Sequence, residues 1–220
     1  MKRLMVIAAL AVASVSCVAN QGDASVRFLN ARALELDDGC SASNDKFISS
    51  GGLDLSGGQN YLLALSVETN TFVQPVVIGQ ETVSGEGLGD VTLTELVYSY
   101  QVSGVSLPAD EVDRTPIYAV FRPETNPDES YLFVYAFGPK ALEQLRAQIG
   151  GSDREVTVLA TIKARGHMSG GQTVETNEIT FPVTVADSGW AGCPADTIAT
   201  GVCGFPGQDS IPIRCVEGGS

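Results

Sequence analysis

The sequence offers few side chains that could carry out nucleophilic or acid–base catalysis. A serine nucleophile needs a base beside it, and the single histidine is His167, with Ser169 two residues later. Both lie in the glycine-rich run Gly166–Gly170, which is not the strand-to-helix turn that presents a catalytic serine. We therefore expect His167 to be an exposed turn residue and the protein to be non-enzymatic.

Acidic side chains cluster in three segments, Asp37–Asp38, Asp110–Asp113 and Asp128–Glu129. Carboxylates could serve a glycosidase or hold calcium, but none of these segments has the alternating ligand spacing of an EF-hand loop. Solvated turns are the simpler interpretation, so we expect no metal ion. The glycine-rich stretches are not followed by helices and form no phosphate loop or dinucleotide fingerprint, so no cofactor is expected either.

The cysteines divide into one near the start and four that can pair. Cys17 stands apart, and Cys40, Cys193, Cys203 and Cys215 form an even set. Every complete pairing of the four joins Cys40 to one of the C-terminal cysteines and leaves the other two to pair locally. We therefore expect two disulfides that staple the chain ends together, with three connectivities open. A zinc site is disfavoured because there is no CxxC motif and only one histidine.

The first residues are typical of an export signal. Lys2 and Arg3 precede the apolar stretch Leu4–Ala13, which is shorter than the roughly 20 residues that a membrane-spanning helix needs. We expect residues 1–16 to be a signal peptide and residues 17–25 to be a short polar tether.

The segment Ser14–Cys17 resembles a bacterial lipobox, with Ser14 where that motif prefers leucine. The resemblance implies that Cys17 carries a diacylglycerol and a palmitate-type acyl chain. The protein would then be attached to its partner, the membrane, through this lipid anchor. The resemblance also implies sorting to the outer membrane, because Ala19 is not the aspartate that signals retention at the inner membrane. The alternative is cleavage after Ala19, which would make the protein periplasmic or secreted.

Charge restricts the partners that this chain can bind. The leader carries two of the 13 basic residues and none of the 26 acidic ones, which leaves eleven basic residues and a net charge of −15. Nucleic acid and anionic lipid surfaces are disfavoured, because the electrostatic contribution to such binding would be repulsive.

Hydrophobic periodicity predicts an all-β protein. Apolar residues alternate with a period of two between Gly and Pro clusters, and one short connecting helix is predicted over Pro139–Ile149, with Gly150 as its stop. Eight such strands suggest an antiparallel immunoglobulin-like β-sandwich over residues 26–186. The predicted strands cover residues 26–36, 61–67, 72–78, 91–102, 117–121, 131–137, 156–164 and 174–185.

The last segment, residues 187–220, lacks convincing alternation and contains three of the cysteines. We expect a C-terminal extension that is a loop held by disulfides and stapled to the domain. Trp190 precedes Cys193 in this extension. It could be a platform for a sugar ring, but packing over the neighbouring disulfide is the simpler interpretation.

Two stretches resemble uncharacterised lipoproteins of myxobacteria and their relatives. The first is Gly166–Val185, with its Phe181-Pro182-Val183 strand, and the second is the tail with Gly192-Cys193, Cys203-Gly204, Gly207-Gln208-Asp209 and Cys215. The chain departs from that family in having no cysteine directly after the Phe-Pro strand and one terminal cysteine instead of a pair. The resemblance implies an outer-membrane lipoprotein with a β-rich body and no assigned activity.

We therefore expect a non-enzymatic structural or interaction domain of the bacterial envelope, with an envelope protein or a glycan as its partner. A carbohydrate-binding or adhesive module is one alternative, and it predicts an exposed strip of aromatic side chains. An envelope hydrolase that uses acidic residues is the other, and it predicts carboxylates that converge in one pocket.

Overall fold

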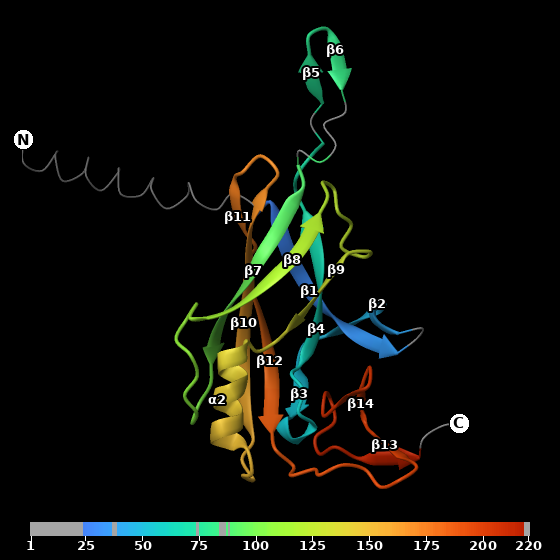
Figure 1. Cartoon of the computed structure of the whole chain (residues 1–220), viewed down its shortest axis with the longest axis vertical. Helices are drawn as coiled ribbons and strands as arrows, with labels where there is room; N and C mark the ends of the chain where they lie inside the picture. The colour runs from blue at the N-terminus through green and yellow to red at the C-terminus, as the bar shows by residue number, and fades with distance from the viewer. Residues whose placement is uncertain (1–23, 37–38, 74, 84–86, 88, 218–220) are drawn as a thin grey trace, which may run out of the picture.

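The computed structural model describes residues 24–36, 39–73, 75–83, 87 and 89–217, and its core is a sandwich of two β-sheets (Figure 1). The first sheet has the strand order β2 (Cys40–Ile48), β1 (Val26–Leu36), β4 (Leu62–Thr69), β9 (Tyr131–Tyr135). The second has the order β3 (Gly51–Asp54), β12 (Ile179–Ala186), β10 (Val156–Met168), β7 (Val91–Gln101), β8 (Asp113–Phe121), with β11 (Thr173–Glu175) paired to β10. The all-β prediction is confirmed.

The core forms because apolar side chains alternate along the strands of both sheets. In β10 every second residue from Val156 to Ala164 is buried, whereas in β4, an inner strand of its sheet, all residues from Leu63 to Val67 are buried. Burial of one such leucine contributes about 2 kcal/mol, so this alternation fixes which face of each strand turns inward.

The predicted helix is α2 (Pro139–Ile149), with the bounds expected from its proline start and glycine stop. It covers one end of the second sheet and packs against β8 (Figure 1). A single 3-10 turn, η1 (Leu55–Gly57), follows β3.

Several elements differ from the prediction. The strands β2 and β3 were not expected, and the stretch 72–78 is a strand only at β5 (Val76–Ile78), which pairs with β6 (Glu81–Val83) in a projecting hairpin (Figure 1). The pair β3–β12 is parallel, which the antiparallel scheme does not include. The immunoglobulin-like arrangement stays a prediction.

The tail contains short strand pairs where the sequence predicts a loop. These pairs are β13 (Thr197–Ala199) with β16 (Cys215–Glu217), and β14 (Gly201–Val202) with β15 (Phe205–Pro206). Two disulfides join Cys40 to Cys203 and Cys193 to Cys215, so one of the three open connectivities is realised. The predicted staple between the two ends of the chain is present.

Side chains of the tail also bind the sandwich directly. The amide of Gln208 pairs with the backbone of Leu62: the Leu62 N–H donates to Gln208 Oε1 at 3.0 Å, and Gln208 Nε2 donates to the Leu62 carbonyl at 2.9 Å. The Tyr61 hydroxyl donates to Asp209 Oδ1 at 3.0 Å. The tail is therefore held by hydrogen bonds as well as by covalent bonds.

Candidate functional site

An aromatic surface lies where the edges of the two sheets meet. We call this surface the seam and define it by the outward-facing residues of the edge strands β8 and β9. In β9 the aliphatic residues Leu132 and Val134 point into the core, which leaves the aromatic residues that alternate with them on the outer face. Tyr118 is 81% exposed, Phe133 45% and Tyr135 44%. The seam consists of Pro116, Tyr118, Val120, Tyr131, Phe133 and Tyr135.

A groove lies at each end of the seam, and both strands line each groove. The first has a volume of about 430 Å³ and lies between Pro116 of β8, Tyr135 of β9 and Leu142 of α2. The second has a volume of about 390 Å³ and contains Val120 together with Tyr131. Tyr118 lies between Pro116 and Val120 in β8, and Phe133 lies between Tyr131 and Tyr135 in β9, so the strand segments that join the two grooves carry exposed rings.

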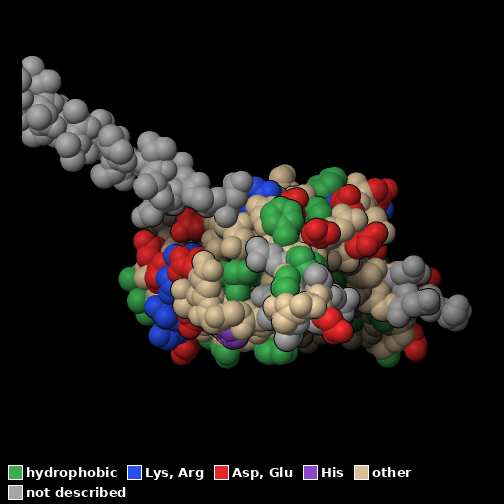
Figure 2. All heavy atoms as spheres, turned by 90° about the horizontal axis from the view of Figure 1, so that it is seen from above, with side chains coloured by type: hydrophobic (Ala, Val, Ile, Leu, Met, Phe, Trp, Pro, Cys, Tyr) green, Lys and Arg blue, Asp and Glu red, His purple; other side chains and the backbone are tan. Residues whose placement is uncertain are grey.

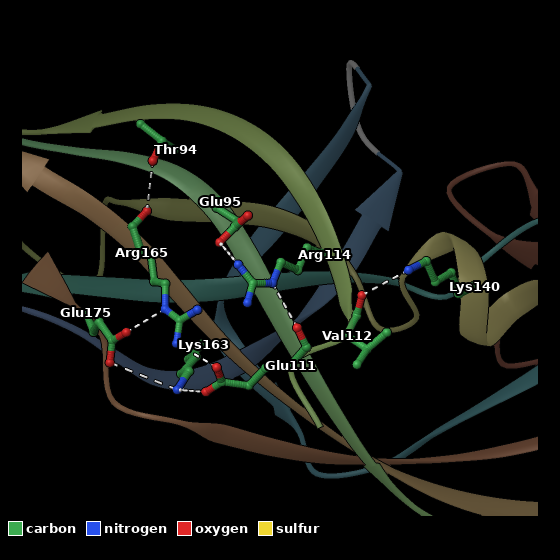
Figure 3. A network of polar contacts seen from close by, with 9 residues as sticks. All are labelled: Thr94, Glu95, Glu111, Val112, Arg114, Lys140, Lys163, Arg165 and Glu175. Carbon is green, nitrogen blue, oxygen red and sulfur yellow. Dashed lines mark hydrogen bonds and ion pairs between the residues drawn. The ribbon is translucent and has the colours of Figure 1, made fainter. Parts of the chain in front are cut away.

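Arginines stand beside the first groove, and their neighbours hold them in place. Arg114 Nε donates to the Glu111 carbonyl at 2.8 Å, and its Nη1 lies 3.4 Å from Glu95 Oε2 (Figure 3). Arg146 Nη2 donates to the Gly58 carbonyl at 2.9 Å. The lining of this groove contains both guanidinium groups and no carboxylate. In contrast, the face of the molecule at the end with the β5–β6 hairpin carries many Asp and Glu side chains (Figure 2).

The start of α2 is fixed by a carboxylate from β8. Asp113 is fully buried and accepts hydrogen bonds from the backbone N–H of Lys140 at 3.2 Å and of Ala141 at 2.9 Å. The Tyr100 hydroxyl donates to the same carboxylate at 3.1 Å, and burial raises the pKa of Tyr100. The prediction that this acidic segment is a solvated turn is wrong for Asp113. Gly138 at the N-cap has no side chain, so this strand residue binds the first N–H groups of the helix.

A network of ion pairs connects the turn before β8 to β10 and β11 (Figure 3). Glu111 pairs with Lys163, and its Oε2 lies 2.8 Å from Arg165 Nη2. Arg165 also pairs with Glu175 at 2.5 Å. Hydrogen bonds from Lys163 and Arg165 lower the pKa of Glu111 to about 2. The network thus holds the residue whose carbonyl positions Arg114.

A buried arginine supports the other end of the seam. Arg32 is 2% exposed, and its Nε donates to Ser66 Oγ at 2.9 Å while Nη2 pairs with Asp128 at 2.6 Å. Its guanidinium group lies 4.2 Å from the centre of the Phe47 ring and 5.8 Å from that of Tyr131. Tyr131 is therefore held in place by a cation–π contact.

The residues considered for catalysis do not form a site. His167 is exposed, as Figure 2 shows, but it lies in strand β10 and not in the turn that was predicted. The Ser169 N–H donates to the Asp90 carbonyl at 3.0 Å. Trp190 is half-buried, and its Nε1 has no hydrogen-bond partner in the described part of the chain.

The lipidation candidate Cys17 and the acidic pair Asp37–Asp38 lie outside the described residues. Within the described ranges, no group of three or more His, Cys, Asp or Glu side chains is arranged to hold a metal ion. The described helices include none with the length and apolar character to cross a membrane.

No protein family, curated protein or solved structure matches this chain.

Sequence reasoning missed the seam residues Tyr118 and Pro116, the arginines Arg114 and Arg146, and the buried Arg32. A signal for the aromatic row was present, because Tyr131, Phe133 and Tyr135 alternate along one strand face. Alternation alone does not say which face is buried. No local sequence pattern indicated that Arg114 and Arg146 share a groove, because the groove forms only when α2 packs beside the strands.

Proposed function

We propose that this protein is a non-enzymatic interaction domain of the bacterial envelope, anchored at the outer membrane by lipid on Cys17, and that it binds its partner through the seam. The observation that carries the binding role is the set of exposed aromatic side chains on the two edge strands that line the same grooves, with Tyr118 81% exposed. Several exposed rings beside a groove are typical of binding surfaces, because apolar side chains are otherwise costly to leave in water.

The seam is rigid as well as exposed, and its rigidity also supports a binding role. The rings of β9 stand on a strand whose alternate residues are in the core, and the Tyr98 hydroxyl donates to the Tyr135 carbonyl at 3.2 Å. Burial raises the pKa of Tyr98 to about 12, so this donor keeps its proton at neutral pH. A surface ordered in advance loses less conformational entropy on binding.

The buried carboxylates have structural roles. The fully buried carboxylates Asp54 and Asp113 each accept hydrogen bonds from backbone N–H groups, as structural carboxylates do. An envelope hydrolase remains the alternative from the sequence, and no observation in the described residues favours it.

Sedimentation with isolated cell envelopes tests the binding role. We expect the purified domain to sediment with envelope fragments, and a variant with the three exposed rings removed to stay in the supernatant. That variant carries Tyr118→Ser, Phe133→Ser and Tyr135→Ser. A matched control removes three exposed apolar side chains elsewhere, and it should sediment like the wild type: Leu29→Ser, Ile198→Ser and Val216→Ser. Equal sedimentation of the two triple variants would refute the proposal.

The anchor has a separate test. The intact mass of protein purified from its native membrane should correspond to a chain that begins at Cys17 and carries added acyl mass. A chain that begins near Asn20 without lipid would instead make the protein periplasmic or secreted, and the binding role of the seam would be unaffected.

A further inference from the structure

The shape and chemistry of the seam indicate the class of its partner, an inference that rests on the proposed function. The exposed rings of Tyr118, Phe133 and Tyr135 present flat apolar surfaces on the strand segments that join the two grooves. Flat apolar surfaces of this kind stack against the ring faces of sugars, whose hydroxyl groups remain free to bind water and polar side chains.

An extended polypeptide fits the seam less well. A peptide that adds a strand to a sheet needs a row of backbone N–H and C=O groups at a regular edge. In β8 Pro116 has no N–H to donate, and the register shifts between the pairs formed by Leu93 and Glu95. Both features are known to protect edges against strand addition. The other edge, β9, has only five residues.

The charges of the first groove favour an anionic ligand. Arg114 Nε and Nη1 and Arg146 Nη2 are held by protein acceptors at 2.8 to 3.4 Å. The remaining N–H groups, on Arg114 Nη2 and on Arg146 Nε and Nη1, have no hydrogen-bond acceptor among the described residues. Guanidinium groups fixed in this way recognise carboxylates by paired hydrogen bonds.

We propose that the seam binds a linear polysaccharide whose sugar rings carry carboxylate groups. The sugar rings stack on the exposed aromatic side chains, and a carboxylate in the first groove pairs with Arg114 and Arg146. Leu142 and Pro139 of α2 form the apolar wall of that groove. Both interactions that the ligand offers, stacking of its rings and paired hydrogen bonds from its carboxylate, therefore have a matching surface on the protein.

The net charge of the protein does not prevent this binding. The whole chain carries −13, but charges farther apart than about 8 Å are largely screened at physiological ionic strength. Arg114, Arg122 and Arg146 line the two grooves of the seam, and Glu129 is the one carboxylate in their linings. Glu95 pairs with Arg114, whereas Arg146 pairs with no carboxylate among the described residues, so a net positive charge remains beside the first groove.

Calorimetric titration with two defined oligosaccharides tests the proposal. The probes are an oligogalacturonate and a neutral maltooligosaccharide with the same number of rings, at about 0.15 M salt. We expect the oligogalacturonate to bind and the neutral oligosaccharide to bind at least about tenfold more weakly, because it lacks the charged hydrogen bonds to arginine.

Variants locate the site. Arg114→Gln and Arg146→Gln should each weaken binding of the oligogalacturonate by about tenfold, and Tyr118→Ala by about fivefold. The matched control is Arg154→Gln, which removes the same charge from an exposed residue outside both grooves and should change the affinity less than twofold. All four positions are exposed, so thermal unfolding should confirm that each variant is folded.

Three outcomes would overturn the proposal: no binding of the oligogalacturonate, equal binding of the two probes, or an equal loss of affinity in Arg154→Gln and Arg146→Gln. These outcomes are distinct from failure of the proposed function. The domain could fail these tests and still sediment with envelopes through its exposed rings. If protease treatment of the envelopes then abolishes sedimentation, the seam binds a protein, and the proposed polysaccharide ligand is refuted while the binding role stands.

Discussion

The carboxylate of Asp113 lies directly against the backbone of Gly138. A β-carbon at position 138 would be 2.5 Å from Asp113 Cγ, closer than such atoms approach in proteins. The glycine at the N-cap of α2 is therefore required by close packing, and it lets a strand residue bind the N–H groups of the helix. This pair sets the position of α2, and hence of the wall of the first groove.

Replacement of Asp113 should destabilise the protein markedly. We expect Asp113→Ala to lower the free energy of unfolding by about 2 to 3 kcal/mol, because it removes the acceptor of two helix N–H groups and leaves the Tyr100 hydroxyl without this partner. Urea denaturation measures the loss. Asp153→Ala, at an exposed residue, is the control and should change stability by less than about 0.5 kcal/mol. Similar losses in both variants would contradict the role of Asp113.

Stability should depend on Glu111 at acid pH. Its pKa in the folded protein is about 2, below the ordinary value of 4.5, because Lys163 and Arg165 donate hydrogen bonds to it. A lowered folded-state pKa means that the stabilisation is fully present above about pH 5 and is lost as the pH falls toward 2. We expect the urea midpoint of Glu111→Gln to vary less over this range than that of the wild type. Glu143→Gln, at an exposed helix position, should follow the wild type, and an identical pH profile for Glu111→Gln would refute the prediction.

The two disulfides should contribute unequally to stability. The bond between Cys40 and Cys203 spans 163 residues and that between Cys193 and Cys215 spans 22. In the chain-entropy treatment the longer loop contributes about 5 kcal/mol and the shorter one about 3 kcal/mol. Double Cys→Ser variants, compared by denaturant unfolding, should show the larger loss for the first pair. A larger loss for the second pair would show that the tail is held mainly by its local bond.

The hydroxyl of Tyr61 should anchor the tail to the sandwich. It donates to Asp209 at 3.0 Å, and burial raises the pKa of Tyr61, so that the donor keeps its proton. Tyr61→Phe should cost about 1 to 2 kcal/mol and increase hydrogen exchange at residues 208–209. Tyr135→Phe, which alters an exposed ring, is the control and should leave exchange in the tail unchanged.

Periodicity predicted the strands whose buried face is aliphatic. The bounds of β1 follow from its apolar spacing, and those of α2 follow from its apolar stripe together with Pro139 at the start and Gly150 at the stop. In contrast, β2 reads CSASNDKFI and was missed, because an edge strand with few buried residues has little hydrophobic pattern of its own. Its pairing is set by β1 and by the disulfide at Cys40.

The candidate site could be predicted only in part. Composition restricted the disulfides to three connectivities, but the choice among them depends on where the tail lies against β2. The aromatic row of β9 was visible as a pattern, whereas its exposure depends on Leu132 and Val134 filling the core instead. The arginine groove brings together residues 114 and 146, which belong to a strand and a helix, and no local signal predicts this contact.

The bond between Cys40 and Cys203 makes most of the sandwich a closed ring of chain. Hydrolysis of one peptide bond anywhere between residues 41 and 202 opens this ring without producing two molecules, so the nicked protein differs in mass from the intact one by a single water. The fragments separate only after reduction. A protease that cuts an exposed loop outside the cell therefore leaves both edge strands of the seam attached to the same molecule.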